Sequence, residues 1–183
     1  RRIGPVADDL SDLAHAFASA ADADVIVSTG GASVGDHDLV RPALESLGAQ
    51  IDFWRVAIKP GKPLLVARRD RQLVVGLPGN PVSSFVTAFL FLLPLLRSLS
   101  GAVRCVSTPV QAKLAHPLPA AGERREFLRA NWDGACVSTQ AVQDSSALLA
   151  LARSNARVAR PGGKAVFRAA RLHDRDERDF PQA

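Results

Sequence analysis

Three segments of the sequence carry the residue types that bind anions. They run from Ser28 to Asp38, from Lys59 to Pro63 and from Gly76 to Ser84. All three are rich in glycine or proline, and glycines allow tight turns in which backbone amides approach a ligand closely. Amides at the start of a helix also attract phosphate. We therefore expect these segments to form an oxyanion site.

The Ser28–Asp38 segment follows a predicted buried strand, Asp24–Thr29, and precedes a predicted helix, Asp38–Leu47. Hydroxyl groups and backbone amides in this loop suit a phosphate. Asp36 and Asp38 would repel a phosphate alone, but they fit the loop if a cation such as Mg²⁺ bridges them to the ligand. The alternative is a tight turn in which one aspartate caps the following helix, and the residues leave both interpretations open.

The second segment places two of the four lysines, Lys59 and Lys62, on a short loop. Two prolines and a glycine restrict its backbone. A lysine ammonium is a compact charge that suits phosphate or molybdate. The alternative is a solvated turn between strands, in which lysines are common.

The third segment ends one predicted strand and starts a long predicted helix at Pro81, a favoured first-turn residue. Ser83 and Ser84 fall in the first turn, where free amides and hydroxyls can face one anion. Ordinary helix capping is the alternative. Three such segments, all at the ends of predicted strands, favour a binding site over three unrelated turns.

Local patterns predict the main elements of the first 101 residues. Asp8 and Asp9 suit the start of a helix, and Ile51–Ile58 alternates as a strand. Pro63–Arg68 and Gln72–Leu77 predict a hairpin, and a long helix is predicted from about Pro81 to Leu99.

The first 101 residues thus alternate between helical and strand patterns, which predicts an α/β sheet with helices on both faces. In such sheets ligands bind at the carboxyl ends of the strands. After Gly101 the apolar runs become short, which predicts a smaller β module and a loose tail. We expect domains at residues 1–101 and 102–172 and a tail at 173–183. The predicted strands of the second domain are Val103–Leu114, Glu126–Asn131, Ala135–Thr139, Ala156–Ala159 and Ala165–Ala169.

Composition and apolar run length argue against nucleic-acid binding and against a membrane segment. The net charge is +5, from 23 basic and 18 acidic residues, and most of the basic residues are Arg. No basic stretch is interleaved with aromatic residues, so we expect no nucleic-acid binding. The most apolar run, Phe85–Leu96, is shorter than the ~20 residues of a membrane span, so we expect no membrane segment and a cytoplasmic protein. GxGxxG, GxxxxGK[ST], GxSxG and HExxH motifs do not occur.

Read together, Ser-Thr-Gly-Gly-Ala-Ser-Val-Gly-Asp-His-Asp (28–38), Lys-Pro-Gly-Lys-Pro (59–63) and Gly-Leu-Pro-Gly-Asn-Pro-Val-Ser (76–83) resemble the molybdopterin molybdenumtransferase family. This is the family of MoeA in bacteria and of the gephyrin E domain in animals, and the chain resembles its C-terminal portion. The resemblance implies a MogA-like three-layer sheet with helices on both faces, followed by a small C-terminal β-barrel-like domain.

The resemblance also implies an activity and a set of site residues. Such enzymes insert molybdate-derived molybdenum into adenylylated molybdopterin and release AMP, with Mg²⁺ as cofactor and a homodimer as the full-length form. The implied catalytic residues are Asp38, Lys59 and Lys62, and the implied metal ligands are Asp36 and Asp38. The implied substrate-binding residues are Gly30, Gly31, Ser33, Gly35, Pro78, Gly79, Asn80, Pro81, Ser83, Arg124 and Ser145.

Two departures from the family bear on this expectation. Two further family regions, an elongated domain and a small α/β domain, would precede the present sequence. The first strand and helix of the MogA-like domain also have no counterpart before Asp8 and Asp9. The alternative function is therefore a non-catalytic molybdopterin-binding or scaffold module.

Overall fold

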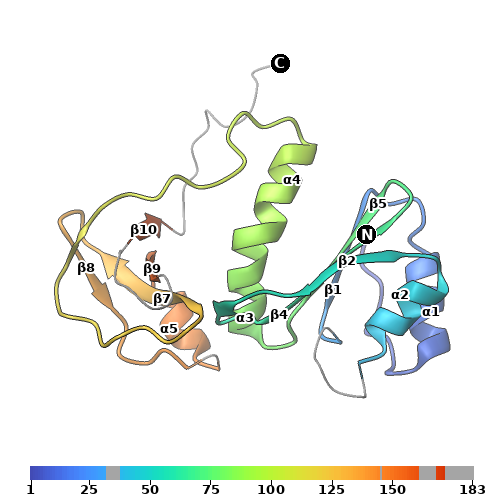
Figure 1. The fold of residues 1–183 in the computed structure, drawn as a ribbon, viewed down its shortest axis with the longest axis horizontal. Coiled ribbons are helices and arrows are strands. Elements are labelled where there is room, and N and C mark those ends of the chain that lie inside the picture. Colours follow the sequence, from blue (N-terminus) through green and yellow to red (C-terminus); the bar gives the residue numbers. More distant parts are fainter. Residues whose placement is uncertain (32–37, 145, 161–167, 172–183) are drawn as a thin grey trace. The chain divides into compact units, whose positions relative to one another are not determined.

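A computed structural model describes residues 1–31, 38–144, 146–160 and 168–171 of the chain. The chain divides into two compact units (Figure 1). Unit 1 contains Arg1–Val56 and Gly61–Asn80, and unit 2 contains Ala57–Pro60 and Pro81–Ala183. The chain therefore crosses between the units more than once.

Unit 1 is a four-stranded mixed sheet with two helices. The strands lie in the order β1-β5-β4-β2. Strand β1 is parallel to β5, whereas β4 is antiparallel to both β5 and β2. The elements are α1 (Leu10–Ala18), β1 (Val25–Thr29), α2 (Val40–Ser46), β2 (Gln50–Arg55), β4 (Pro63–Arg69) and β5 (Gln72–Leu77).

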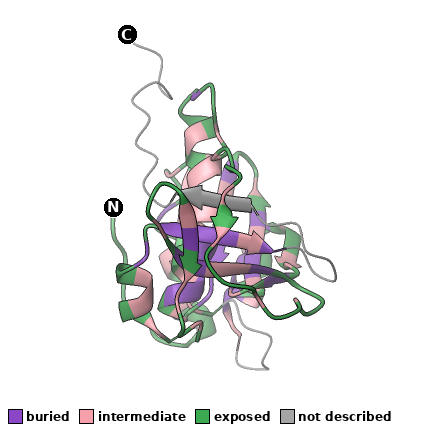
Figure 2. Ribbon diagram, turned by 90° about the vertical axis from the view of Figure 1, so that its left-hand side faces the viewer, coloured by how far each residue is buried: buried purple, intermediate pink, exposed green. Residues whose placement is uncertain are grey.

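The core of unit 1 forms where α1 and α2 pack on the sheet. Phe17 of α1 and Leu44 of α2 belong to one buried cluster with Leu65 of β4 and Val74 of β5. Burying a side chain of this size contributes roughly 1.5–3 kcal/mol. Leu64, on the other face of β4, is also fully buried. Burial on both faces is the pattern expected of a central α/β strand. Across the chain as a whole, Figure 2 shows buried residues in purple, many of them on strands.

Local signals explain where several of these elements begin and turn. Asp9 is the N-cap of α1, and its carboxylate accepts hydrogen bonds from the amides of Ser11 and Asp12 at 2.8 and 3.0 Å. The predicted β4–β5 hairpin is present, and its turn contains Asp70 with a φ of 53°. Aspartate tolerates this left-handed conformation better than most residues do.

The predicted strand Ile51–Ile58 is wrong in its second half. Strand β2 ends at Arg55, and the Val56 amide turns back to donate to the Lys62 carbonyl at 3.1 Å. The following residues form a separate strand, β3 (Ile58–Lys59), which belongs to unit 2. A long-range partner therefore breaks a pattern that is locally continuous.

Unit 2 holds a six-stranded sheet in the order β10-β9-β7-β8-β6, with β3 paired to β7. Its core cluster contains Ala130, Val137, Ala156 and Val158. The elements are β3, α3 (Pro81–Thr87), the π-helical turn η1 (Ala88–Leu92), α4 (Leu93–Leu99), β6 (Lys113–Leu114), β7 (Arg125–Trp132), β8 (Cys136–Thr139), α5 (Leu148–Ala152), β9 (Ala156–Arg160) and β10 (Arg168–Arg171).

Two predictions in this region need correction. The predicted strand Val103–Leu114 forms only at Lys113–Leu114. Val103 and Val106 are 82% and 71% exposed, and Pro109 has no amide to donate to a ladder. The short helix α5 was not predicted, because its five residues are too few to show a helical period.

The predicted long helix from Pro81 to Leu99 is present but contains the π-helical turn η1. Pro94 lacks an amide, and its ring would clash with the carbonyl of the residue four positions earlier. A wider turn is one way for a helix to accommodate such a residue.

By length and composition alone, the 19-residue stretch Pro81–Leu99 is one helix of the described chain that could cross a membrane. A single helix of this kind is weak evidence, because the core helix of a soluble domain meets the same criterion. The absence of a membrane segment stays a prediction.

Candidate functional site

The glycine-rich loop after β1 and the Pro/Gly segment after β5 meet in unit 1. Strands β1 and β5 are parallel neighbours, with Ser28 opposite Gly76 and Thr29 opposite Leu77. Beyond the strand ends, the Gly30 amide donates to the Leu77 carbonyl at 3.1 Å. The two segments therefore leave the same edge of the sheet side by side, as predicted for ligand-binding loops of α/β sheets.

Backbone conformation and close packing both require glycine at Gly30, Gly31 and Gly79. Gly30 and Gly31 have φ values of 87° and 65°, which other residues rarely adopt. A Cβ on Gly79 would lie 3.4 Å from the Gly30 Cα, and a Cβ on Gly31 would lie 2.4 Å from Cγ2 of Val40. No Cβ covers the backbone at this turn, so its amides can come close to a ligand.

Asp38 lies just before α2, and its two carboxylate oxygens differ. Oδ1 accepts a hydrogen bond from the Val40 amide at 3.3 Å. Oδ2 is buried and has no hydrogen-bond partner among the described residues. Burial raises the pKa of Asp38, and backbone hydrogen bonds from Val40 and Arg41 lower it in part. The N-cap of α2 is Leu39, which makes no side-chain cap hydrogen bond, so the alternative in which Asp38 is the N-cap is not found. One oxygen of Asp38 accepts from the Val40 amide, and the buried Oδ2 keeps an unused acceptor among the described residues.

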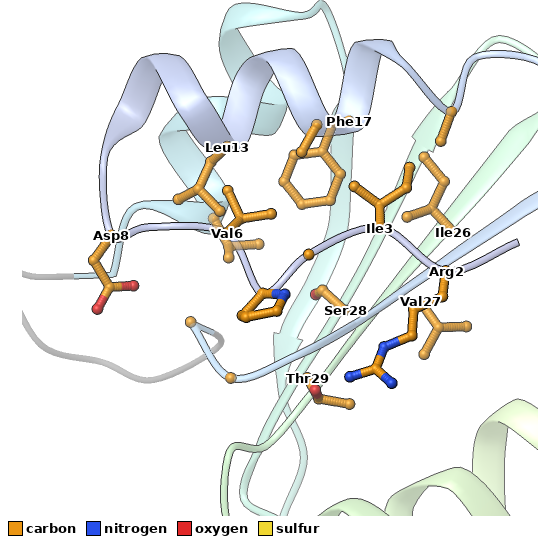
Figure 3. Close-up of a pocket in the computed structure, with 17 residues that line it drawn as sticks. Arg2, Ile3, Val6, Asp8, Leu13, Phe17, Ile26, Val27, Ser28 and Thr29 are labelled. Carbon is orange, nitrogen blue, oxygen red and sulfur yellow. The ribbon is translucent and has the colours of Figure 1, made fainter.

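A cavity of about 450 Å³ adjoins the Gly30–Gly31 turn in unit 1. Figure 3 shows the Asp8 carboxylate at one end, the Arg2 guanidinium near the other, and apolar side chains such as Phe17 on the side of α1. The Ser28 hydroxyl also lines it, and this oxygen is buried without a hydrogen-bond partner among the described residues. The cavity can hold a molecule with both apolar and charged parts.

Asp8 was not predicted as a site residue. The sequence interpretation used Asp8 and Asp9 together as the start of a helix. One residue suffices as an N-cap, and Asp9 fills that position. The second aspartate of the pair was the available signal, because it has no capping role and lines the cavity.

In unit 2, strand β3 fixes Lys59 beside β7. The carbonyl of Ile58 accepts a hydrogen bond from Nη1 of Arg124 at 3.4 Å. The Lys59 side chain is 58% exposed, and its Nζ lies 3.7 Å from Oε1 of Glu126. Lys59 and Arg124, both predicted as site residues, thus belong to the same short region of unit 2.

Glu126 and Arg160 are charged residues that the sequence interpretation missed. They are 7% and 5% exposed and form an ion pair with each other. For Glu126 the available signal was a charged residue at the start of a predicted strand, since a charge is rarely buried unless it is paired. Arg160 lies one residue beyond the predicted strand Ala156–Ala159 and gave no such signal. Both residues line a cavity of about 380 Å³ together with Lys59, Gln140 and Gln143.

The remaining predicted residues divide between the units. Lys62, Pro78 and Asn80 belong to unit 1, whereas Pro81 and Ser83 open α3 in unit 2. The Lys-Pro-Gly-Lys-Pro motif itself is divided, because Lys59 belongs to unit 2 and Lys62 to unit 1. Ser33, Gly35, Asp36 and Ser145 lie outside the described residues.

Within the described parts of the chain, no group of three or more His, Cys, Asp or Glu side chains is arranged to hold a metal ion. The sequence prediction of a cation at Asp36 and Asp38 therefore has one described ligand, Asp38.

Two family matches cover most of the chain. Residues 1–98 match the family described as a "probable molybdopterin binding domain", and residues 111–170 match the "MoeA C-terminal region (domain IV)".

Curated relatives carry names from the same biosynthesis. The chain is 40% identical over 100 residues to a molybdopterin molybdenumtransferase of Haemophilus influenzae, covering 54% of this chain and 24% of the relative. It is 44% identical over 110 residues to the molybdenum cofactor synthesis protein cinnamon of Drosophila melanogaster, covering 59% and 18%. It is 32% identical over 155 residues to a molybdopterin molybdenumtransferase of Staphylococcus aureus, covering 82% and 37%. The chain thus spans well under half the length of these relatives.

Solved structures share the fold. A molybdopterin biosynthesis MoeA protein from Pyrococcus horikoshii superposes with a TM-score of 0.73 at 26% identity, covering 91% of this chain and 42% of that chain. A molybdenum cofactor biosynthesis protein from Pyrococcus furiosus gives a TM-score of 0.67 at 22% identity, covering 90% and 56%. The predicted α/β fold with a C-terminal β domain is confirmed by these matches, and the chain belongs to the MoeA family of molybdopterin-binding proteins.

Proposed function

We propose that this chain provides part of the site at which molybdenum is inserted into molybdopterin during molybdenum cofactor biosynthesis. The names of the curated relatives support the pathway. The observation that carries the proposal is the meeting of the Gly30–Gly31 turn with Gly79 beside the partly unsatisfied carboxylate of Asp38. Such a turn suits the phosphate of adenylylated molybdopterin, and AMP would be the product released.

In unit 1, the Gly30–Gly31 turn after β1 would bind the ligand phosphate and orient the ligand. Its backbone amides would donate to phosphate oxygens, and the residues that the resemblance adds there are Gly30, Gly31, Ser33, Gly35, Pro78, Gly79 and Asn80. Gly30 and Gly31 cannot be replaced without strain, which keeps the approach open. The adjoining 450 Å³ cavity is large enough to receive part of a small ligand.

Asp38 fits a divalent cation. Its buried Oδ2 lacks a hydrogen-bond partner among the described residues, and carboxylate oxygens are ligands that Mg²⁺ prefers. We propose that Asp38 and Asp36 would hold Mg²⁺ against the ligand phosphates, where the ion would supply charge neutralisation. A cation would also remove the electrostatic cost of keeping the Asp38 carboxylate buried.

The lysines and arginine complete the proposed chemistry. The resemblance assigns Lys59 and Arg124 of unit 2, and Lys62 of unit 1, to holding molybdate or offsetting charge on the phosphoryl group. It also assigns substrate-binding roles to Pro81, Ser83 and Ser145. The Lys59 side chain is more than half exposed, so a ligand can reach its ammonium.

Further properties of the whole protein are proposals of the same kind. We propose a homodimeric full-length form in the cytoplasm, with no nucleic-acid partner. We also propose domain limits at residues 1–101 and 102–172, with a tail at 173–183.

The test is calorimetric titration of this chain with adenylylated molybdopterin, with and without Mg²⁺. We expect binding that Mg²⁺ strengthens and that Asp38→Ala weakens, while the matched control Asp22→Ala at an exposed site leaves it unchanged. Binding without molybdenum transfer would instead support the alternative of a binding or scaffold module. The proposal fails if the wild-type chain binds neither molybdopterin nor its adenylate.

A further inference from the structure

Three charged residues form one row across three adjacent strands of unit 2. Strand β3 pairs in parallel with β7, which places Lys59 opposite Glu126. On the other edge of β7, the antiparallel strand β9 places Arg160 opposite the same glutamate. Directly paired residues share a face of the sheet, so the row reads cation, anion, cation.

The two ends of the row differ in burial. Arg160 is 5% exposed and Glu126 is 7% exposed, and their ion pair is closed off from water. Lys59 keeps a 58% exposed side chain, yet its Nζ is 3.7 Å from the second oxygen of Glu126. Glu126 thus uses one carboxylate oxygen for a buried arginine and the other for an accessible lysine.

The backbone around this row is also fixed. The Arg125 amide donates to the Ala57 carbonyl at 2.9 Å, and Nη1 of Arg124 donates to the carbonyl of Ile58 at 3.4 Å. These bonds hold the short strand β3 against β7 immediately before the Lys59 side chain. What they leave undetermined is the direction of the long lysine side chain, which only Glu126 constrains among the described contacts of Lys59.

We propose that Glu126 is a positioning residue for Lys59, and that Arg160 holds the Glu126 carboxylate in place for this task. The proposal rests on the proposed function only for its consequence in molybdenum insertion. The net charge of the row stays positive, because two cations flank one carboxylate. The ammonium of Lys59 is therefore restrained without losing its attraction for an oxyanion.

The structural test uses the small number of lysines. The sequence contains Lys59, Lys62, Lys113 and Lys164, so the chain labelled with ¹³Cε-lysine gives four side-chain NMR signals that Lys→Arg variants assign. Relaxation measurements report how restricted each Cε is. We expect Lys59 to be more restricted than the exposed Lys113, and Glu126→Gln to reduce its order parameter to that of Lys113.

Matched variants separate positioning from a general effect on folding. Glu123→Gln removes an exposed carboxylate from the preceding loop and should leave the Lys59 signal unchanged. Arg160→Met should loosen Lys59 through Glu126, while Lys113 stays as in the wild type. The proposal is overturned if Lys59 in the wild-type chain is no more ordered than Lys113, a result that needs no variant to fold.

The second readout is molybdenum insertion by the chain. Glu126→Gln should lower kcat about tenfold and leave KM for molybdate within about twofold, because positioning acts on the reacting geometry. Glu126→Asp should recover part of the loss. A merely electrostatic role predicts the opposite, since removing a carboxylate beside Lys59 would strengthen oxyanion binding. If wild-type insertion is absent, the proposed function fails while the NMR result stands independently.

Discussion

The Cα of Gly30 lies 3.4 Å from the position that a Cβ would take on Gly79. These residues are 49 positions apart in the sequence, and they meet because β1 and β5 are parallel neighbours. The contact joins the first and third motifs at one edge of the unit 1 sheet.

The glycine turn can be tested through stability. Gly31→Ala should lower the free energy of unfolding by ~2–3 kcal/mol, because its Cβ would overlap Cγ2 of Val40 and its φ is 65°. Gly48 has a φ of 77°, but a Cβ there would meet no atom within 4 Å. Gly48→Ala should therefore lower the free energy of unfolding by only about 1 kcal/mol. A Cβ on Gly122 would also meet no atom within 4 Å, so Gly122→Ala should leave the free energy of unfolding nearly unchanged. Urea unfolding of the three variants measures their free energies of unfolding. Equal losses in all three would contradict close packing at the Gly31 turn.

Because the Asp38 carboxylate is buried, its replacement should stabilise the fold and weaken Mg²⁺-dependent ligand binding. Asp38→Asn should raise the melting temperature at pH 7, because it removes a charge whose Oδ2 lacks a hydrogen bond among the described residues. The same change should abolish the strengthening of ligand binding by Mg²⁺. Thermal melts and calorimetry measure the two effects.

The pH dependence of this effect has a definite sign. Burial raises the pKa of Asp38 above its ordinary value of 3.8. A carboxyl with a raised folded-state pKa favours the folded state at low pH and loses that contribution as pH rises through the raised pKa. The advantage of Asp38→Asn should therefore vanish below about pH 3.8 and grow as pH rises through the raised pKa. A constant advantage from pH 3 to 8 would show that charge burial is not its cause.

Two arginines that face each other across β7 and β9 predict opposite mutational effects. Arg157 is 2% exposed, its guanidinium lies 3.6 Å from the centre of the Phe89 ring, and its Nε and Nη1 have no hydrogen-bond partner among the described residues. Arg157→Leu should stabilise the chain by ~1–2 kcal/mol, since it replaces an incompletely bonded buried cation with an apolar side chain.

Its cross-strand partner, Arg129, provides the contrast. Nη2 of Arg129 donates to the carbonyls of Val142 and Asp144 at 3.3 and 2.9 Å. Arg129→Leu should destabilise by about 2 kcal/mol, because the two hydrogen bonds to the Val142 and Asp144 carbonyls are lost. Chemical denaturation of both variants measures the pair, and destabilisation of similar size in both would refute the distinction.

High pH should reduce the benefit of Arg157→Leu. Burial lowers the pKa of Arg157 to about 9. Below this pH the folded state carries the full cost of the buried charge, and above it the unfolded state binds more protons, so wild-type stability gains from a rising pH. The difference between variant and wild type should be constant from pH 6 to 8 and shrink above about pH 9.

Lys59 should contribute to oxyanion binding more than a lysine elsewhere. Lys59→Ala should weaken molybdate binding by about tenfold, the effect of losing roughly one charge-assisted contact. Lys113→Ala removes the same charge at an exposed position of unit 2 and should have little effect. Molybdate titration followed by calorimetry compares them. Equal weakening would indicate only a general effect of net charge.

Several features follow from the sequence by itself. The three motifs, the β4–β5 hairpin and the helix start at Pro81 depend on glycine, proline and capping residues, whose preferences act over a few positions. The resemblance of these motifs to the MoeA family is likewise a property of residue order, and it led to the correct fold.

Only the tertiary structure decided which distant residues meet. Strand pairing brings Gly79 to Gly30 and forms the row of Lys59, Glu126 and Arg160. It also divides the apparent strand Ile51–Ile58 between two sheets. Such pairings depend on the free energy of the whole fold, because each strand accepts several partners with nearly equal local preference. Local pattern therefore identified the candidate motifs, and the fold determined their neighbours.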